Sequence, residues 1–173
     1  MTTSAKVSPR IYVADLAAYN AGRLHGVWIE ATDELEEINK QVQAMLAGSP
    51  EDHAEEYAIH DYEGFGGLSL SEFEGLERVH ELALFIDENE LGAALLSHFD
   101  GDLDEACAAL ENYAGTHESA ADFAQELTEE CQQVPENLAH YIDYEAMARD
   151  MELSGDIFTI EAGFQEVHIF WSR

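Results

Sequence analysis

The stretch "IYVADLAAYNAGRLHGVWIEA", residues 11–31, decides the fold at the amino-terminal end of the chain. Two runs rich in β-branched and aromatic residues flank the turn-like "YNAG", which is the pattern of two paired strands. A helix is predicted over residues 33–47, with Asp33 as its cap and Glu36 three residues further on. The run "EYAIHDYEGF", residues 56–65, then predicts a third strand that leads into the glycine-rich "EGFGG". These elements predict a small α/β amino-terminal domain over residues 1–74.

Residues 75–111 are predicted to form a helical, acidic middle domain. Apolar side chains recur there at helical spacing, with glutamates on the opposite side of the helix. The apolar stripe consists of Leu76, Val79, Ala83 and Ile86, and the glutamates are Glu74, Glu77, Glu81 and Glu88.

The end of this section, "DGDLDEACAALE" at residues 100–111, has the acidic spacing of an EF-hand calcium loop. Such a loop needs glycine at its sixth position, where the chain turns sharply, and Glu105 stands there instead. The apolar positions of the stretch also fall at helical spacing. We therefore interpret it as a helix that carries Asp104, Glu105 and Glu111, and we expect no metal site.

Residues 112–173 are predicted to form an α+β carboxyl-terminal domain. Ser119 can cap a helix in which Phe123 and Leu127 face a core. After Pro135 the pattern predicts a further helix that ends at Gly155.

The closing run "DIFTIEAGFQEVHIFW", residues 156–171, predicts a hairpin about Ala162 and Gly163. With this hairpin, the predicted fold class is α+β, with the chain divided into three sections.

The charge of the chain is large and unevenly placed. Thirty-seven acidic and seven basic residues give a formal net charge of −30. Residues 41–148 hold 26 acidic residues and one basic residue, Arg78, whereas residues 1–40 hold six and four. A disordered acidic segment would show few aromatic residues and no periodicity, but this one has aromatic residues within helical patterns. We therefore predict that the acidic part is folded, that it repels nucleic acid and anionic membranes, and that its partners are basic.

A further helix pattern places Asp122, Glu126, Glu129 and Glu130 on one stripe, about 12 Å long at 1.5 Å per residue. One such stripe is equally typical of a solvated helix face, but its repetition on successive helices without a compensating lysine favours a functional surface. Thirty charges correspond to about 50 Å of duplex DNA, or about fifteen base pairs. We call the predicted surface carboxylates the acidic set. It consists of Glu74, Glu77, Glu81, Glu88, Asp104, Glu105, Glu111, Asp122, Glu126, Glu129 and Glu130.

Hydropathy and cysteine content indicate the cellular compartment of the protein. No apolar run is long enough to cross a bilayer, and no signal segment is recognisable at the amino end, so we expect a cytoplasmic protein. Cys107 and Cys131 are too few and too isolated for a zinc site or a disulfide framework, and we expect reduced core residues. The sequence indicates no cofactor.

Two other classes of protein are alternatives to a protein with a DNA-like surface. A halophilic protein or another acidic protein-binding module would also be acidic and poor in lysine, but a halophilic excess should be spread along the chain. An enzyme is disfavoured, because "HELALF" at His80 lacks the second histidine of a zinc metalloprotease and no nucleophile elbow occurs. His60 beside Asp61, and His98 beside Phe99, are more typical of structural histidines than of catalytic groups.

Several stretches of the chain resemble the ArdA antirestriction proteins of conjugative plasmids and transposons. They are "IYVADLAAYNAGRLHGVWI", "EYAIHDYEGF", "LLSHFDGD", "ENLAHYIDYEAMARDMELSGD" and the closing "VHIFW". The resemblance implies an elongated, curved homodimer of three-domain subunits that mimics bent DNA and inhibits type I restriction-modification enzymes, evading a host defence. It also implies that the dimer contacts lie in the carboxyl-terminal domain. The lack of a catalytic constellation in the sequence separately predicts that the protein is not an enzyme.

Overall fold

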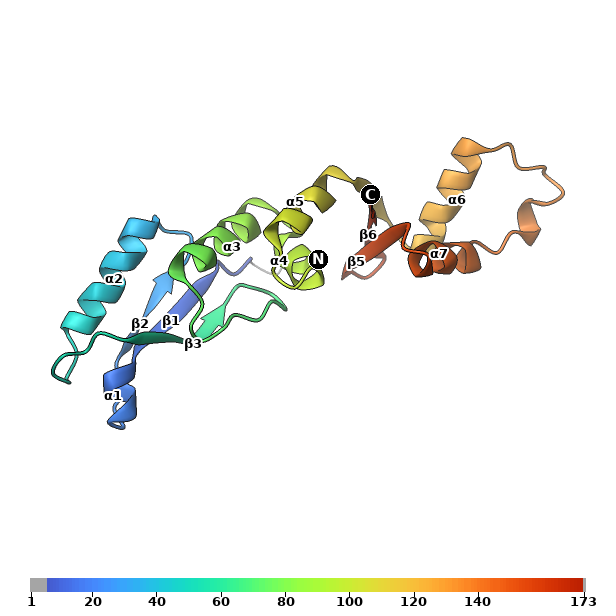
Figure 1. Cartoon of the computed structure of the whole chain (residues 1–173). Helices are drawn as coiled ribbons and strands as arrows, with labels where there is room; N and C mark the ends of the chain where they lie inside the picture. The colour runs from blue at the N-terminus through green and yellow to red at the C-terminus, as the bar shows by residue number, and fades with distance from the viewer. Residues whose placement is uncertain (1–5, 173) are drawn as a thin grey trace. The chain divides into compact units, whose positions relative to one another are not determined.

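The structure, a computed structural model, describes residues 6–172. The chain divides between Leu103 and Asp104 into two compact units. Within residues 6–172 there are seven α-helices, one short 3-10 helix and two three-stranded antiparallel sheets, which confirms the α+β class (Figure 1). The division into three sections, 1–74, 75–111 and 112–173, stays a prediction.

The first sheet has the order β2-β1-β3, with β1 (Arg10–Asp15) in the centre between β2 (Gly26–Glu30) and β3 (Tyr57–Glu63). The predicted pairing of the first two strands and the prediction of a third strand are confirmed, and β3 pairs with β1; both pairings are antiparallel. The link between β1 and β2 is more than a turn, because it contains the short helix α1 (Leu16–Asn20). Asp15 starts this helix, since its Oδ1 accepts hydrogen bonds from the backbone N–H groups of Ala17 and Ala18 at 2.9 and 3.3 Å.

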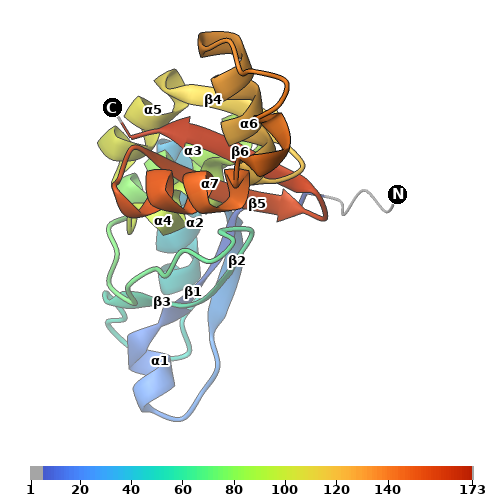
Figure 2. The same ribbon diagram turned by 90° about the vertical axis from the view of Figure 1, so that its right-hand side faces the viewer.

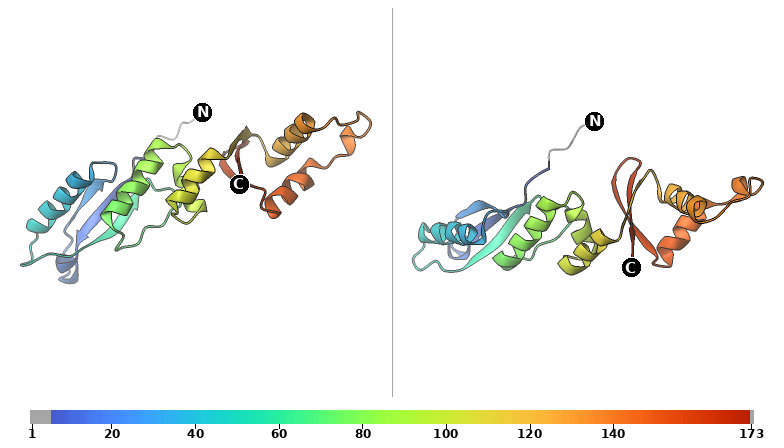
Figure 3. Two further views of the ribbon diagram at one scale, coloured as in Figure 1. Left: turned by 45° about the horizontal axis from the view of Figure 1, so that its top comes forward. Right: turned by 90° about the horizontal axis from the view of Figure 1, so that it is seen from above.

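Helix α2 (Leu35–Ala47) packs on β1 and β2 (Figure 3). It buries Ile38 and Val42 against the fully buried Ile11, Val13 and Ile29 of the sheet. The helix itself is confirmed, but the predicted cap is wrong.

The capping residue of α2 is Glu34, which forms no side-chain capping hydrogen bond. Asp33 instead accepts a hydrogen bond from Gln41 Nε2 at 3.5 Å. The helix starts one residue later than the pattern indicated, so that the spacing between Asp33 and Glu36 no longer matches a capping box.

Three helices follow the first sheet: α3 (Leu76–Glu88), α4 (Gly92–His98) and α5 (Leu103–Glu111). The predicted apolar stripe of α3 is buried throughout, which confirms the helical interpretation. Residues 100–111 are likewise helical from Leu103 onwards, as predicted. The α3–α4 junction is close, because a Cβ on Gly92 would lie 2.8 Å from the Cα of Ile86.

The second unit is built on a sheet of order β4-β6-β5, with β4 (Tyr113–His117), β5 (Ile157–Gly163) and β6 (Glu166–Trp171). Helices α6 (Ala120–Cys131) and α7 (Tyr144–Leu153) pack on each other and beside these strands (Figure 2). Phe123, Ile157 and Ile169 form the core between them. Ser119 caps α6 as predicted, since its Oγ accepts from the backbone N–H of Asp122 at 3.1 Å.

Two predicted boundaries in this unit are wrong. Pro135 does not begin the next helix, because a 3-10 turn (Ala139–Tyr141) comes first and α7 starts at Tyr144. The start is set by Asp143, whose Oδ1 accepts from the backbone N–H of Ala146 at 2.9 Å. The hairpin is confirmed, but residues 164–165 make its turn, two positions later than predicted, with Gln165 at φ +54°.

The cysteines also differ from expectation. Cys107 and Cys131 are free thiols, and both are exposed instead of buried. On α5 the core is formed by the neighbouring Ala106 and by Ala109, which turns Cys107 outward.

Candidate functional site

The acidic set on α3 is presented by the helix itself. The buried stripe fixes one side of α3 against the core, and Glu77, Glu81 and Glu88 therefore lie on the exposed side. Glu74 behaves differently, because it precedes the helix and is half-buried. Its Oε2 accepts from the backbone N–H of Ser71 at 3.2 Å, and its Oε1 lies 3.6 Å from Arg78 Nε. Glu74 is thus part of a local network rather than of the open acidic face.

On α5 the acidic set occupies both ends of the helix. Asp104 and Glu105 are exposed in the first turn, where a negative charge stabilises the positive end of the helix dipole. Glu111 is exposed at the last position, where a negative charge opposes the dipole, and no basic residue lies in that turn. Helix stability therefore accounts for the first two carboxylates and not for Glu111.

On α6 the stripe is exposed over its whole length, from Asp122 to Glu130. Two of its members have partners: Glu126 Oε2 lies 2.6 Å from Nε2 of His117 on β4, and Glu129 Oε1 accepts from Gln125 Nε2 at 3.0 Å. The pairing of Glu126 links α6 to the sheet, a role that the sequence did not indicate.

Basic side chains do not neutralise these helices. In the part of the chain that the structure describes, no carboxylate of the acidic set on α3 or α6 forms an ion pair with lysine or arginine. The ion pairs of this kind join Arg10 to Glu63 and Glu30, Arg23 to Glu51, Lys40 to Glu36, and Arg78 to Glu74. These four bases thus pair with carboxylates outside α3 and α6.

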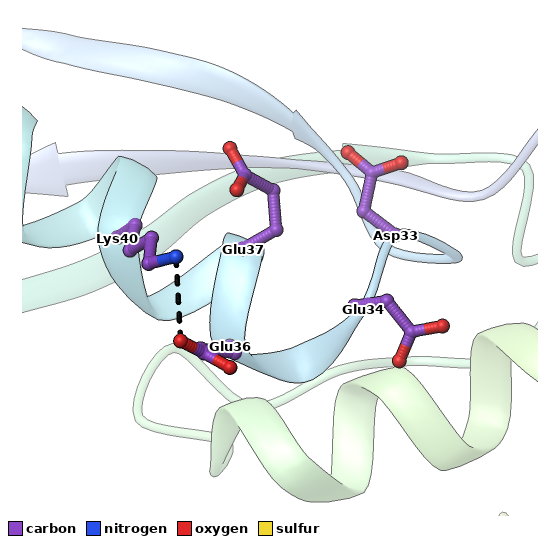
Figure 4. Close-up of a pocket in the computed structure, with 5 residues that line it drawn as sticks. All are labelled: Asp33, Glu34, Glu36, Glu37 and Lys40. Atoms are coloured by element: carbon purple, nitrogen blue, oxygen red, sulfur yellow. Dashed lines mark ion pairs between the residues drawn. The ribbon is translucent and has the colours of Figure 1, made fainter.

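A further group of carboxylates was not included in the acidic set. They line a hollow of about 410 Å³ at the start of α2, which we call the acid hollow (Figure 4). Its lining residues are Asp33, Glu34, Glu36, Glu37 and Lys40, with Lys40 Nζ 3.3 Å from Glu36 Oε1. In the sequence these carboxylates stand out as four acidic residues within residues 33–37, a cluster that also fits the start of a helix.

The histidines that could suggest catalysis are held in structural contacts. His60 Nε2 lies 3.4 Å from Glu72 Oε1, and the His60 ring packs edge-on to Tyr19. Its sequence neighbour Asp61 instead accepts from the backbone N–H of Tyr62 at 2.8 Å. His80 Nδ1 lies 2.9 Å from the backbone oxygen of Ala31.

Residues 6–172 contain neither a cluster of metal ligands nor a membrane-spanning helix. Nowhere in residues 6–172 do three histidine, cysteine or carboxylate side chains gather as metal ligands would. None of the helices described here is both long enough and apolar enough to cross a membrane.

Comparison with known protein families identifies the family of the chain. A search of the curated proteins found no match. Residues 11–166 match the family model of the antirestriction protein ArdA. The match covers the elements from β1 to β5, except Arg10 at the start of β1, and the first residue of β6. The chain therefore belongs to the ArdA family of antirestriction proteins.

Proposed function

We propose that this antirestriction protein is a DNA mimic that occupies the DNA-binding groove of type I restriction-modification enzymes. The observation that supports this most strongly is that α3 and α6 each present exposed carboxylates, none of which pairs with a lysine or arginine of residues 6–172. The ArdA family is a family of inhibitors and is not a known enzyme family, so binding rather than chemistry has to account for its effect.

The charge of the protein is sufficient for this role. A net charge of −30 corresponds to about fifteen base pairs of duplex DNA at one charge per 1.7 Å. Successive carboxylates on one helix face are about 5 to 6 Å apart, which is comparable to the spacing of phosphates along a strand. Lysines and arginines that normally bind phosphates could therefore pair with the acidic set instead.

The energetic argument is that the helices keep unfavourable charges. Like charges four residues apart on a helix cost about 0.2 to 0.5 kcal/mol, and a glutamate-to-lysine exchange would remove that cost. Glu126 and Glu130 have this spacing on α6, and Glu77 and Glu81 have it on α3. A function that needs negative charge explains why these positions are not neutralised.

Such a surface reproduces only part of DNA. Phosphate contacts position a protein on the duplex, whereas contacts to base edges read the sequence. The acidic set offers no base edges, so inhibition should be independent of the DNA sequence that the target enzyme recognises. The mechanism is competitive occupancy, with no covalent step and no cofactor.

We further propose the setting in which this takes place. The protein acts as a homodimer in the bacterial cytoplasm, is encoded by a mobile element such as a conjugative plasmid, and binds the methyltransferase core of the enzyme. Contacts between its subunits are proposed for residues 112–173. A dimer would carry a net charge equal to that of about thirty base pairs of duplex DNA, twice that of one chain.

The decisive experiment is a competition on the purified methyltransferase core of a type I enzyme. The protein should form a stable complex with the core and displace a labelled DNA duplex, because both occupy the same basic groove. The inhibition constant of the protein should be the same whether the displaced duplex contains the recognition sequence or lacks it, after correction for the affinity of each duplex for the core. A complex that leaves DNA binding intact would contradict the mimic mechanism while leaving antirestriction in place.

A further inference from the structure

A second hollow in the first unit differs in character from the acid hollow. Its volume is about 430 Å³, and its lining residues are of apolar and aromatic types together with two glutamates. We call it the aromatic hollow. Its lining residues are Leu16, Glu55, Glu56, Tyr57 and Phe73.

The backbone holds three separate segments together around this hollow. The N–H of Leu16, at the start of α1, donates to the carbonyl oxygen of Glu56 at 3.1 Å. The N–H of Ile59 on β3 donates to the carbonyl oxygen of Glu72 at 2.8 Å, which places Phe73 beside the strand. Backbone hydrogen bonds therefore hold the segments that line the hollow in place.

The side chains of the hollow lack partners of their own. Glu55 and Glu56 are exposed, and neither side chain forms a hydrogen bond or an ion pair with any residue in the described range 6–172. Phe73 leaves 70% of its surface exposed, and its ring stacks on no other aromatic ring in that range. Phe73 therefore offers an accessible aromatic face in a hollow that also contains two glutamates without an ion-pair partner among residues 6–172.

The chemistry of these lining residues suits an arginine side chain. Its guanidinium group stacks on aromatic faces and pairs with carboxylates, and it is more weakly hydrated than an ammonium group. Its aliphatic stem can lie along an apolar wall such as Leu16. The acid hollow has a similar volume and more carboxylates but no aromatic wall, and its one lysine already pairs with Glu36.

We propose that the aromatic hollow binds an arginine side chain of a partner protein, as a discrete anchor beside the diffuse acidic helices. The identity of the partner rests on the proposed function, but the binding of arginine does not. A test on the isolated protein therefore separates the two proposals.

The test uses N-acetylarginine methylamide and its neutral isostere, N-acetylcitrulline methylamide, as probes. The ring resonances of Tyr57 and Phe73 are followed by NMR while each probe is added to the full-length protein. The arginine probe should bind about tenfold more tightly than the citrulline probe, because the charge and the cation–π contact are present only in the former. Equal affinities of the two probes would overturn the proposal.

Matched variants distinguish this site from general attraction to an acidic protein. Glu55→Gln together with Glu56→Gln should remove the preference for arginine, whereas Glu34→Gln with Glu37→Gln, which neutralises the same charge in the acid hollow, should preserve it. Phe73→Leu should weaken the arginine probe about three- to fivefold, with Tyr57 as the reporter, because the aromatic face is lost. Unchanged binding to the Phe73→Leu variant, or an equal loss in both glutamine pairs, would show attraction by charge alone and would also overturn the proposal.

Discussion

At the scale of single residues, Glu126 and Glu130 have the same chemistry and different surroundings. Glu126 bonds to His117 across the α6–β4 contact, whereas the side chain of Glu130 has no hydrogen-bond or ion-pair partner in the described part of the chain. We expect Glu126→Gln to lower the free energy of unfolding by up to about 1 kcal/mol, the range measured for exposed pairs. Glu130→Gln should leave it unchanged or slightly higher, since it removes like-charge repulsion. Urea denaturation of both variants measures the difference, and equal midpoints would mean that the His117 contact carries no stability.

The same single substitutions bear on binding at this scale. Each exposed pair with a basic groove contributes only about 0.2 to 1 kcal/mol, so Glu130→Gln should weaken methyltransferase binding by less than about tenfold. Titration calorimetry or fluorescence anisotropy can measure the change. If one neutralisation abolished antirestriction while the protein stayed folded, a localised site would have to replace the distributed surface.

At the scale of elements, α6 can be tested as a unit. Neutralising Asp122, Glu126, Glu129 and Glu130 together should weaken binding far more than any single change, while Phe123 and Leu127 keep the helix on its core. Circular dichroism provides the control for folding. A quadruple variant that binds as the parent does would exclude α6 from the interface.

The cap of α6 gives a stability prediction that is independent of function. Ser119→Ala removes the acceptor for the backbone N–H of Asp122 and should cost about 1 kcal/mol of unfolding free energy. Ser119→Gly should cost less, a few tenths of a kcal/mol, because glycine is itself a tolerated capping residue. If thermal unfolding ranked the two variants in the opposite order, the capping hydrogen bond would not be the source of the effect.

Elements with strong periodicity could be predicted from the sequence, and those made by tertiary pairing could not. The strands β1 and β2 and the buried face of α3 follow directly from apolar spacing. Strand β4 was missed because "YAGTH" contains a glycine at φ +115° and lacks an apolar alternation; its pairing with β6 makes it a strand. The exposure of the carboxylates on α3, α5 and α6 could be predicted because helix spacing fixes which side chains point outward, whereas Glu74, which precedes α3, is half-buried. The aromatic hollow could not, since Leu16, Tyr57 and Phe73 meet only through the folded backbone.

At the scale of the whole molecule, the charge predicts a steep response to salt. Screening shortens the reach of a charge to about 8 Å at physiological ionic strength, so raising the salt concentration should weaken the complex with the methyltransferase and slow its formation. Binding measured across a range of sodium chloride concentrations tests this. A flat response would mean that apolar contacts dominate and that the acidic set is incidental.

The oligomeric state is the second prediction at this scale. One chain carries charge for about fifteen base pairs, and a dimer would match a longer stretch of bound DNA. Sedimentation at micromolar concentration in moderate salt should therefore give twice the mass of 19.2 kDa. A strictly monomeric protein would contradict the homodimer and would still be compatible with mimicry.

Because both native thiols are exposed, the chain can be labelled with a fluorescent dye without any substitution. Cys107 lies three residues after Asp104 and four before Glu111 on α5, so these side chains share one helix face, and Cys131 directly follows Glu130 at the end of α6. A maleimide dye attached to either thiol would therefore be placed among the carboxylates without any engineered cysteine. Docking of a basic partner would shield the dye, so the emission of each label, and its protection from a soluble quencher, would reveal which of the two helices is covered.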